Sequence, residues 1–210
     1  MVRPGGTGVV LAASLMFAPA LLNLVLLLLT GEDPSGTIAP LVGLVGMWVF
    51  AGAAYALARS SRLEIGMLAP HRRGWIIAVG LGVVLMLAVP VLSMIGAAFT
   101  ADSGLGSRGS VGIVIAGVVT AAVTEEVIFR GVGITALENA GVPTRGAALI
   151  SLFAFALVHI ASWPLAHVLF VVLPLGAVLT WCYVRFRNLP VVILAHALVD
   201  APLVVFALAG

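Results

Sequence analysis

Charged residues are scarce in this sequence. Ten basic and eight acidic side chains make up 9% of 210 residues, and every basic residue is arginine. Apolar residues make up 62%, and the mean hydropathy is +1.26. A soluble domain carries about a quarter charged residues. The composition therefore excludes a soluble domain, offers no basic surface for nucleic acid, and predicts a polytopic membrane protein.

Disulfides, linkers and repeats are also missing. Cys182 is the only cysteine, so the chain forms no intramolecular disulfide. No low-complexity tract separates the apolar segments, and no internal repeat is visible. We therefore expect a single transmembrane domain over residues 1–210.

The apolar runs predict an all-α fold of about seven transmembrane helices in one bundle. Each run has roughly the 20 residues that a bilayer core requires, and a lipid-exposed backbone must be helical to satisfy its own polar groups. The first run is too long for a signal peptide. The expected spans are 8–29, 37–58, 75–99, 110–133, 145–163, 165–186 and 189–208.

The arginines predict the orientation of the bundle. Only Arg108 falls on one side of the expected spans, and the others share the opposite side: Arg3, Arg59, Arg62, Arg72, Arg73, Arg130, Arg145, Arg185 and Arg187. By the positive-inside rule the N-terminus is cytoplasmic. After an odd number of spans the C-terminus is external.

Two short patterns are interpreted as structural. "GLGSRG" at 104–109 fits a dinucleotide-binding pattern, but no strand precedes it and no βαβ unit surrounds it. Small residues at four-residue spacing, Gly112 with Ala116 and Gly117 with Ala121, predict close helix packing. Neither pattern predicts chemistry.

Six ionisable residues are expected at membrane depth: Glu125, Glu126, Arg130, His159, His196 and Asp200. An ionised side chain there costs at least about 2.5 kcal/mol unless it is paired or hydrated, so each is a functional hypothesis. Consecutive residues point about 100° apart on a helix, so the two glutamates have different tasks. Arg130 lies one turn after Glu126, and an ion pair between them would leave Glu125 available.

The two histidines complete the pattern. Asp200 lies one turn after His196 and is placed to hold its imidazole, whereas His159 follows Phe155 by one turn, and we interpret Phe155 as a packing residue. A glutamate and a histidine around a water suit hydrolysis, and the other His and Asp suit stabilisation of an oxyanion. Counted along its span, His159 lies nearer the outer face than Glu125. Either its helix begins in the cytoplasm around Pro143, or the helix is tilted.

Three motifs carry a resemblance to a known family. "EEVIFRG" at 125–131, "FALVH" at 155–159 and "HALVD" at 196–200 resemble the CAAX prenyl protease and bacteriocin-processing family of intramembrane proteases, also called CPBP or Abi. The likeness covers about 110–210, the protease-like core, with motifs on the fourth, fifth and seventh expected helices. In that family the last motif more often ends in asparagine. Ionised Asp200 can only accept a hydrogen bond, so orienting His196 suits it better than binding the oxyanion.

The resemblance implies an activity and a role for each residue. Glu125 and His159 would activate the attacking water, Glu126 and Arg130 would support the site, and His196 with Asp200 would stabilise the oxyanion. The implied activity is endopeptidase cleavage of a membrane-embedded or prenylated substrate, and we expect an integral protein of a bacterial cytoplasmic membrane.

The need for a metal stays open at this point. Zinc binds His nitrogen and Asp or Glu oxygen, and family members are often labelled metalloproteases. Zinc or another divalent ion would take its ligands from Glu125, His159, His196 and Asp200. The H-E-x-x-H signature is absent, and an activated water needs no metal, so we favour a site without a cofactor.

Two other classes of function remain as alternatives. An ion-coupled transporter would use the same groups as relays, but it predicts broken helices or inverted repeats, which the sequence does not show. A non-catalytic immunity or binding protein could use the same scaffold. A protease instead predicts that Glu125, His159 and His196 converge on one water-accessible cavity.

Overall fold

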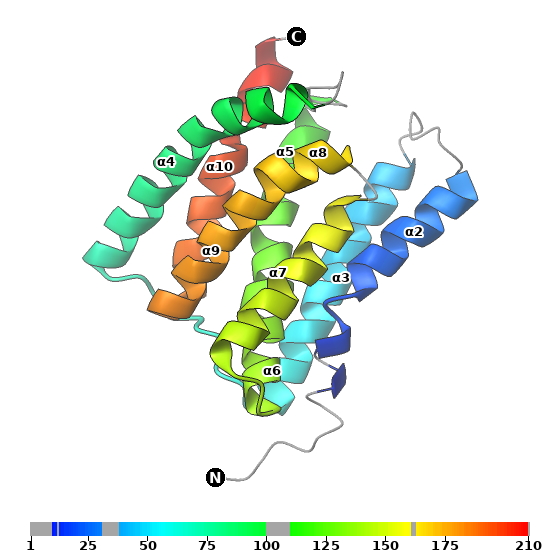
Figure 1. Cartoon of the computed structure of the whole chain (residues 1–210). Helices are drawn as coiled ribbons and strands as arrows, with labels where there is room; N and C mark the ends of the chain where they lie inside the picture. The colour runs from blue at the N-terminus through cyan, green and yellow to red at the C-terminus, as the bar shows by residue number, and fades with distance from the viewer. Residues whose placement is uncertain (1–9, 12, 31–37, 100–109, 161–162, 210) are drawn as a thin grey trace. The chain divides into compact units, whose positions relative to one another are not determined.

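The computed structural model describes residues 10–11, 13–30, 38–99, 110–160 and 163–209. These residues form helices and no strand, in agreement with the predicted fold class (Figure 1). In chain order the elements are α2 (Ala18–Thr30), α3 (Ile38–Ser60), α4 (Arg72–Ala97), α5 (Val111–Thr120), η1 (Ala121–Ile134), α6 (Thr135–Asn139), α7 (Thr144–Ile160), α8 (Leu165–His167), η2 (Val168–Val172), α9 (Leu173–Phe186) and α10 (Leu189–Ala209).

Five continuous helical segments of the described chain are long and apolar enough to cross a membrane: Leu41–Ser60, Arg72–Ala97, Val111–Asn139, Leu165–Phe186 and Leu189–Leu208. Several elements therefore join end to end into one span, as α8, η2 and α9 do. The expected spans at 165–186 and 189–208 match closely. Two of the expected spans correspond to shorter helices. The helix α2 has 13 residues, and α7 has 17.

The first expected span, 8–29, is wrong as a single uninterrupted helix. Residues 15–17 form a turn, in which the Phe17 N–H donates to the Ser14 carbonyl at 3.0 Å, and α2 begins only at Ala18. Pro19 lies in the first turn of α2. Proline is accepted there because the first N–H groups of a helix lack intrahelical acceptors, and it is unfavourable further inside. Apolar content alone does not reveal this break.

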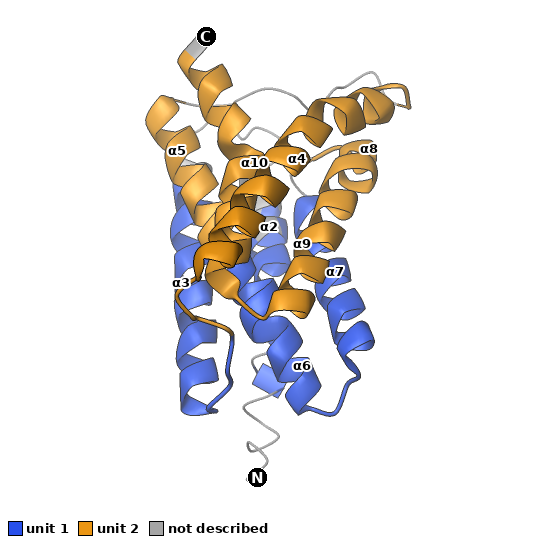
Figure 2. Cartoon of the chain, turned by 90° about the vertical axis from the view of Figure 1, so that its left-hand side faces the viewer, with its two compact units in different colours: residues 1–65, 124–162 blue, residues 66–123, 163–210 orange. Residues whose placement is uncertain are grey.

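The chain divides into two compact units, each made of two separate stretches of sequence (Figure 2). Unit 1 comprises 1–65 and 124–162, and in it α2 packs on α3 and α7. Unit 2 comprises 66–123 and 163–210, and in it α10 packs on α4, α5 and α9. Glu125 and His159 thus lie in unit 1, and His196 and Asp200 in unit 2.

Close helix packing occurs at a different glycine from those predicted. A Cβ placed on Gly112 or Gly117 would meet no described atom within 4 Å, so the small-residue prediction is wrong for both. On α4, a Cβ at Gly82 would lie 2.7 Å from the Cβ of Leu198 and 3.1 Å from the Ala195 carbonyl oxygen. Glycine at 82 therefore allows α4 and α10 to approach within unit 2. The "GLGSRG" stretch lies outside the described residues.

Candidate active site

The first motif lies on an unusual helix. The 14 residues of η1, Ala121–Ile134, are wound as a π-helix, with backbone hydrogen bonds from residue i to i+5. Such winding is rare and is found frequently at functional sites. Its polar side chains are buried: Glu125 is 8% exposed, and Glu126 and Arg130 are fully enclosed. The widened helix thus holds three ionisable groups away from solvent.

Glu126 and Arg130 form the ion pair that their spacing predicted. Arg130 Nη1 donates to Glu126 Oε1 at 3.1 Å, and both side chains are buried. The guanidinium also lies over the ring of Phe155, with its carbon 4.1 Å from the ring centroid. Arg130 is therefore held from its own helix by a carboxylate and from α7 by an aromatic face, which is a cation–π arrangement.

Two further contacts fix α7 against η1. The Ser151 hydroxyl, fully buried, donates to the Phe129 carbonyl at 2.7 Å. The rings of Phe129 and Phe155 meet edge to face, with centroids 5.5 Å apart. The sequence analysis interpreted Phe155 as a packing residue and gave Ser151 no role. It missed the contact of each with the motif helix, because a single sequence does not show which turn of α7 lies beside η1.

The same contacts place His159 near the level of Glu125. The short connection after Asn139 makes α7 run antiparallel to the helix that carries η1. Phe129 is level with Phe155. Glu125 lies four residues before Phe129, and His159 lies four residues after Phe155. Because the two helices are antiparallel, moving back along η1 and forward along α7 leads in the same direction. The helix α7 begins at Thr144, directly after Pro143. The difference in depth between His159 and Glu125 that counting along the expected spans gave therefore does not arise within unit 1.

His159 has one tautomer in this arrangement. Its Nδ1 lies 2.9 Å from the Phe155 carbonyl oxygen, and its ring lies 4.5 Å from the Phe155 ring. A carbonyl only accepts hydrogen bonds, so Nδ1 must carry the hydrogen. In the neutral ring the lone pair then lies on Nε2, which is the atom that can accept a proton or bind a ligand.

The third motif lies on α10 in unit 2. Asp200 Oδ2 is 3.5 Å from Nε2 of His196, one turn away, so the two side chains are paired as their spacing predicted. The distance exceeds the usual 2.7–3.2 Å of an N–H···O hydrogen bond. His196 is buried, whereas Asp200 is about one quarter exposed. Asp200 therefore sits where it can orient the imidazole.

Metal binding can be tested against the donors within each unit. In neither unit do the described residues bring together three His, Cys, Asp or Glu side chains placed to hold one ion. Glu126 is moreover engaged by Arg130.

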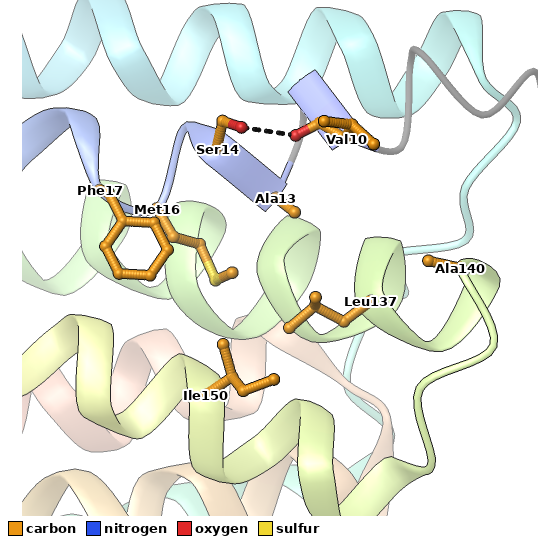
Figure 3. Close-up of a pocket in the computed structure, with 8 residues that line it drawn as sticks. All are labelled: Val10, Ala13, Ser14, Met16, Phe17, Leu137, Ala140 and Ile150. Atoms are coloured by element: carbon orange, nitrogen blue, oxygen red, sulfur yellow. Dashed lines mark hydrogen bonds between the residues drawn. The ribbon is translucent and has the colours of Figure 1, made fainter.

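An apolar pocket of about 240 Å³ lies elsewhere in unit 1, between the chain before α2 and helices α6 and α7 (Figure 3). Seven of its eight lining residues are apolar, and the eighth, Ser14, donates its hydroxyl to the Val10 carbonyl at 2.8 Å. None of the predicted site residues lines it. This pocket offers hydrophobic volume and no acid or base.

Taken together, the helices and their buried acid–base groups define an all-helical integral membrane protein with ionisable side chains inside its spans. A family model described as type II CAAX prenyl endopeptidase Rce1-like matches residues 107–202. The match covers the part of the chain that carries the three motifs, and it agrees with the family of endopeptidases that they predicted. No curated protein and no solved structure matched the chain.

Phe155→Leu tests the role of the ring between Arg130 and His159. We expect a loss of about 1–3 kcal/mol of stability, because the cation–π contact and the aromatic pair are both removed. We also expect slower turnover, because the His159 ring loses its neighbour. Phe153→Leu is the matched control, since Phe153 is on the same helix but 62% exposed. Thermal unfolding and cleavage rate are measured for both; equal effects of the two substitutions would contradict the assignment.

Proposed function

We propose that the protein is an intramembrane endopeptidase that hydrolyses a peptide bond of a membrane-embedded or prenylated substrate with an activated water. The observation that carries the proposal is the register of α7 on η1. The contacts of Phe155 and Ser151 with Phe129 support a position of His159 at about the same height as Glu125. A carboxylate and an imidazole facing one water are a general-base pair for hydrolysis.

In the proposed reaction, Glu125 and Nε2 of His159 hold the water and Glu125 takes its proton as the oxygen attacks the carbonyl carbon. The proton then passes to the leaving amine, and the C–N bond breaks. The fixed Nδ1–H of His159 supports this role, because it keeps the Nε2 lone pair directed away from the helix backbone.

His196 is proposed to stabilise the oxyanion that develops in the transition state, with Asp200 as its orienting partner. Preorganised donors at such an oxygen contribute about 3–4 kcal/mol each in hydrolases. The 3.5 Å pairing of the two side chains supports the division of roles, since Asp200 as a carboxylate accepts and does not donate. Convergence of His196 with Glu125 and His159 on one cavity is part of the proposal.

Glu126 and Arg130 are proposed as supports of the site. Their ion pair lets two charges remain buried next to Glu125, and the contact of Arg130 with Phe155 links them to the helix of His159. The proposed cycle contains no metal step, because a water activated by a glutamate needs none. The arginine distribution supports a cytoplasmic N-terminus and an external C-terminus.

The proposal is tested by offering full-length protein in lipid a panel of labelled membrane peptides, each with and without a prenylated C-terminal cysteine. The expected result is one new pair of fragments, identified by mass, from at least one prenylated or membrane-embedded peptide. His196→Ala serves as the control for contaminating proteases. Equal cleavage by that variant would overturn the assignment of these residues, and intact peptides throughout would favour the non-catalytic binding protein.

A further inference from the structure

Ser151 forms an unusual hydrogen bond for a serine in the middle of a helix. Such a serine can donate to the carbonyl four residues earlier on its own helix, which for Ser151 is that of Ala147. The hydroxyl instead crosses to the Phe129 carbonyl on η1, at 2.7 Å, between residues 22 positions apart in sequence. Ser151 and Phe129 are both 0% exposed. The bond is therefore enclosed, and its length is close to the most frequent O–H···O distance.

Small side chains on α7 make this bond possible. The buried face of α7 includes Ala147, Ser151 and Ala154 next to Phe155. Small residues allow membrane helices to approach closely, so that a short hydroxyl can reach the backbone of the neighbouring helix. Ser151 therefore acts on the main chain of η1 and not on one of its side chains.

The acceptor of this bond belongs to a helix with a wide hydrogen-bond ladder. In the π-helical winding of η1 the Phe129 carbonyl is expected to accept from the Ile134 N–H, whereas in an α-helix it would accept from Gly133. Helical ladders are disturbed where a side chain inserts into them. The Ser151 hydroxyl occupies one of the two lone pairs of the carbonyl oxygen. It therefore competes with the α-helical bond and favours the wider ladder.

The peptide group that Ser151 holds lies at the centre of the contacts between η1 and α7. On one side of this group, Phe129 meets the Phe155 ring edge to face, and on the other side Arg130 places its guanidinium over the same ring. Because α7 holds η1 at these two residues, a change of winding must rotate the residues beyond them. Glu125, four residues before Phe129, is one of these. The winding therefore sets the direction of Glu125 relative to α7.

We propose that Ser151 is a positioning residue of the active site. Its hydrogen bond to the Phe129 carbonyl keeps η1 in the π-helical winding, and this winding directs Glu125 toward the water that it shares with His159. Ser151 acts through the backbone of η1 and contacts neither water nor substrate. Its part in catalysis rests on the proposed function, whereas its part in the winding does not.

The first measurement concerns the winding and needs no substrate. Crystal structures of the full-length wild type and of Ser151→Ala in lipid show which N–H the Phe129 carbonyl accepts. We expect the Ile134 N–H in the wild type and the Gly133 N–H in the variant. The matched control is Ser93→Ala, which should keep the wild-type ladder. Ser93 is a buried serine on α4, and its hydroxyl has no hydrogen-bond partner among the described residues. A Ser151→Ala structure that keeps the Ile134 bond would overturn the proposal.

The second measurement separates turnover from substrate binding. A displacement of about 1 Å can lower a rate by about a hundredfold, so we expect Ser151→Ala to lower kcat by about ten- to hundredfold and to leave KM within about threefold. Ser151→Cys retains a weak donor and should have an intermediate kcat. Ser93→Ala should keep kcat within about threefold of the wild-type value.

The two measurements distinguish a failure of this proposal from a failure of the proposed function. If Glu125→Gln abolishes turnover but Ser151→Ala has the same kcat as Ser93→Ala, Ser151 does not position Glu125 and the proposal is overturned. If the wild type cleaves no peptide, or Glu125→Gln leaves kcat unchanged, the proposed function fails. The two structures then still decide whether Ser151 holds the winding of η1.

Discussion

Glu125→Gln is expected to lower kcat/KM for peptide cleavage by about 10²- to 10⁴-fold, the usual contribution of a general base. Glutamine has nearly the size of glutamate and can still hold the water, but it cannot take the proton. Because Glu125 is buried on η1 and the substitution removes a charge from membrane depth, the fold should be retained. Thermal unfolding of the variant should therefore stay close to that of the wild type.

The matched control for this prediction is Glu64→Gln. Glu64 is exposed in the segment after α3 and is far along the chain from the motifs, so the same change of charge there should leave kcat/KM unaltered. Initial rates over a range of substrate concentrations separate kcat from KM. A loss of less than threefold in Glu125→Gln, or an equal loss in Glu64→Gln, would remove Glu125 from the reaction.

Arg130→Leu is expected to cost about 3–5 kcal/mol of stability, because it leaves the carboxylate of Glu126 buried without its cation. The effect should be large because both members of the pair are fully enclosed. The guanidinium contact with the Phe155 ring is lost in the same step. Denaturant titration of the full-length protein in mixed micelles gives the free energy of unfolding.

The double variant Glu126→Leu with Arg130→Met separates two causes of the lost stability: the unpaired charge of Glu126 and the missing bulk of the Arg130 side chain. Apolar side chains of similar volume often replace a buried ion pair without loss, so the double variant should recover most of the stability. Arg145→Leu, at an exposed position of α7, should change the free energy of unfolding by less than about 0.5 kcal/mol. If the double variant is less stable than Arg130→Leu, the buried charge of Glu126 is not the cause of the loss.

The local part of the candidate site could be predicted from sequence because it depends on helical spacing. Glu126 pairs with Arg130, and His196 with Asp200, since residues four apart share one face of a helix. The family assignment of 107–202 likewise followed from short motifs in order. These features need no knowledge of which helices are neighbours.

The rest depends on contacts that periodicity does not encode. The π-helical winding of η1 shifts residues relative to an ordinary helix, and the spacing of residues along the sequence gives no sign of it. The bond from Ser151 to the Phe129 carbonyl and the stacking of Arg130 on Phe155 each join residues more than twenty positions apart. The depth of His159 was ambiguous for the same reason, since its level is set by the packing of α7 on η1.

The start of the chain illustrates a different limit. The run at 8–29 is predominantly apolar, and hydropathy therefore predicts one span. The turn at 15–17 and the new helix start before Pro19 depend on backbone constraints of proline and on local hydrogen bonds. Hydropathy thus found the apolar segments but not where each helix begins.

The central claim is that a glutamate, and not a metal ion, activates the water. It is tested most directly by measuring turnover of a cleaved peptide by protein stripped with a strong chelator, with the residual metal content of the same sample determined. Undiminished turnover is expected at far less than one metal ion per chain, and no turnover is expected from Glu125→Gln treated in the same way. Turnover that disappears on stripping and returns in proportion to added zinc would contradict it.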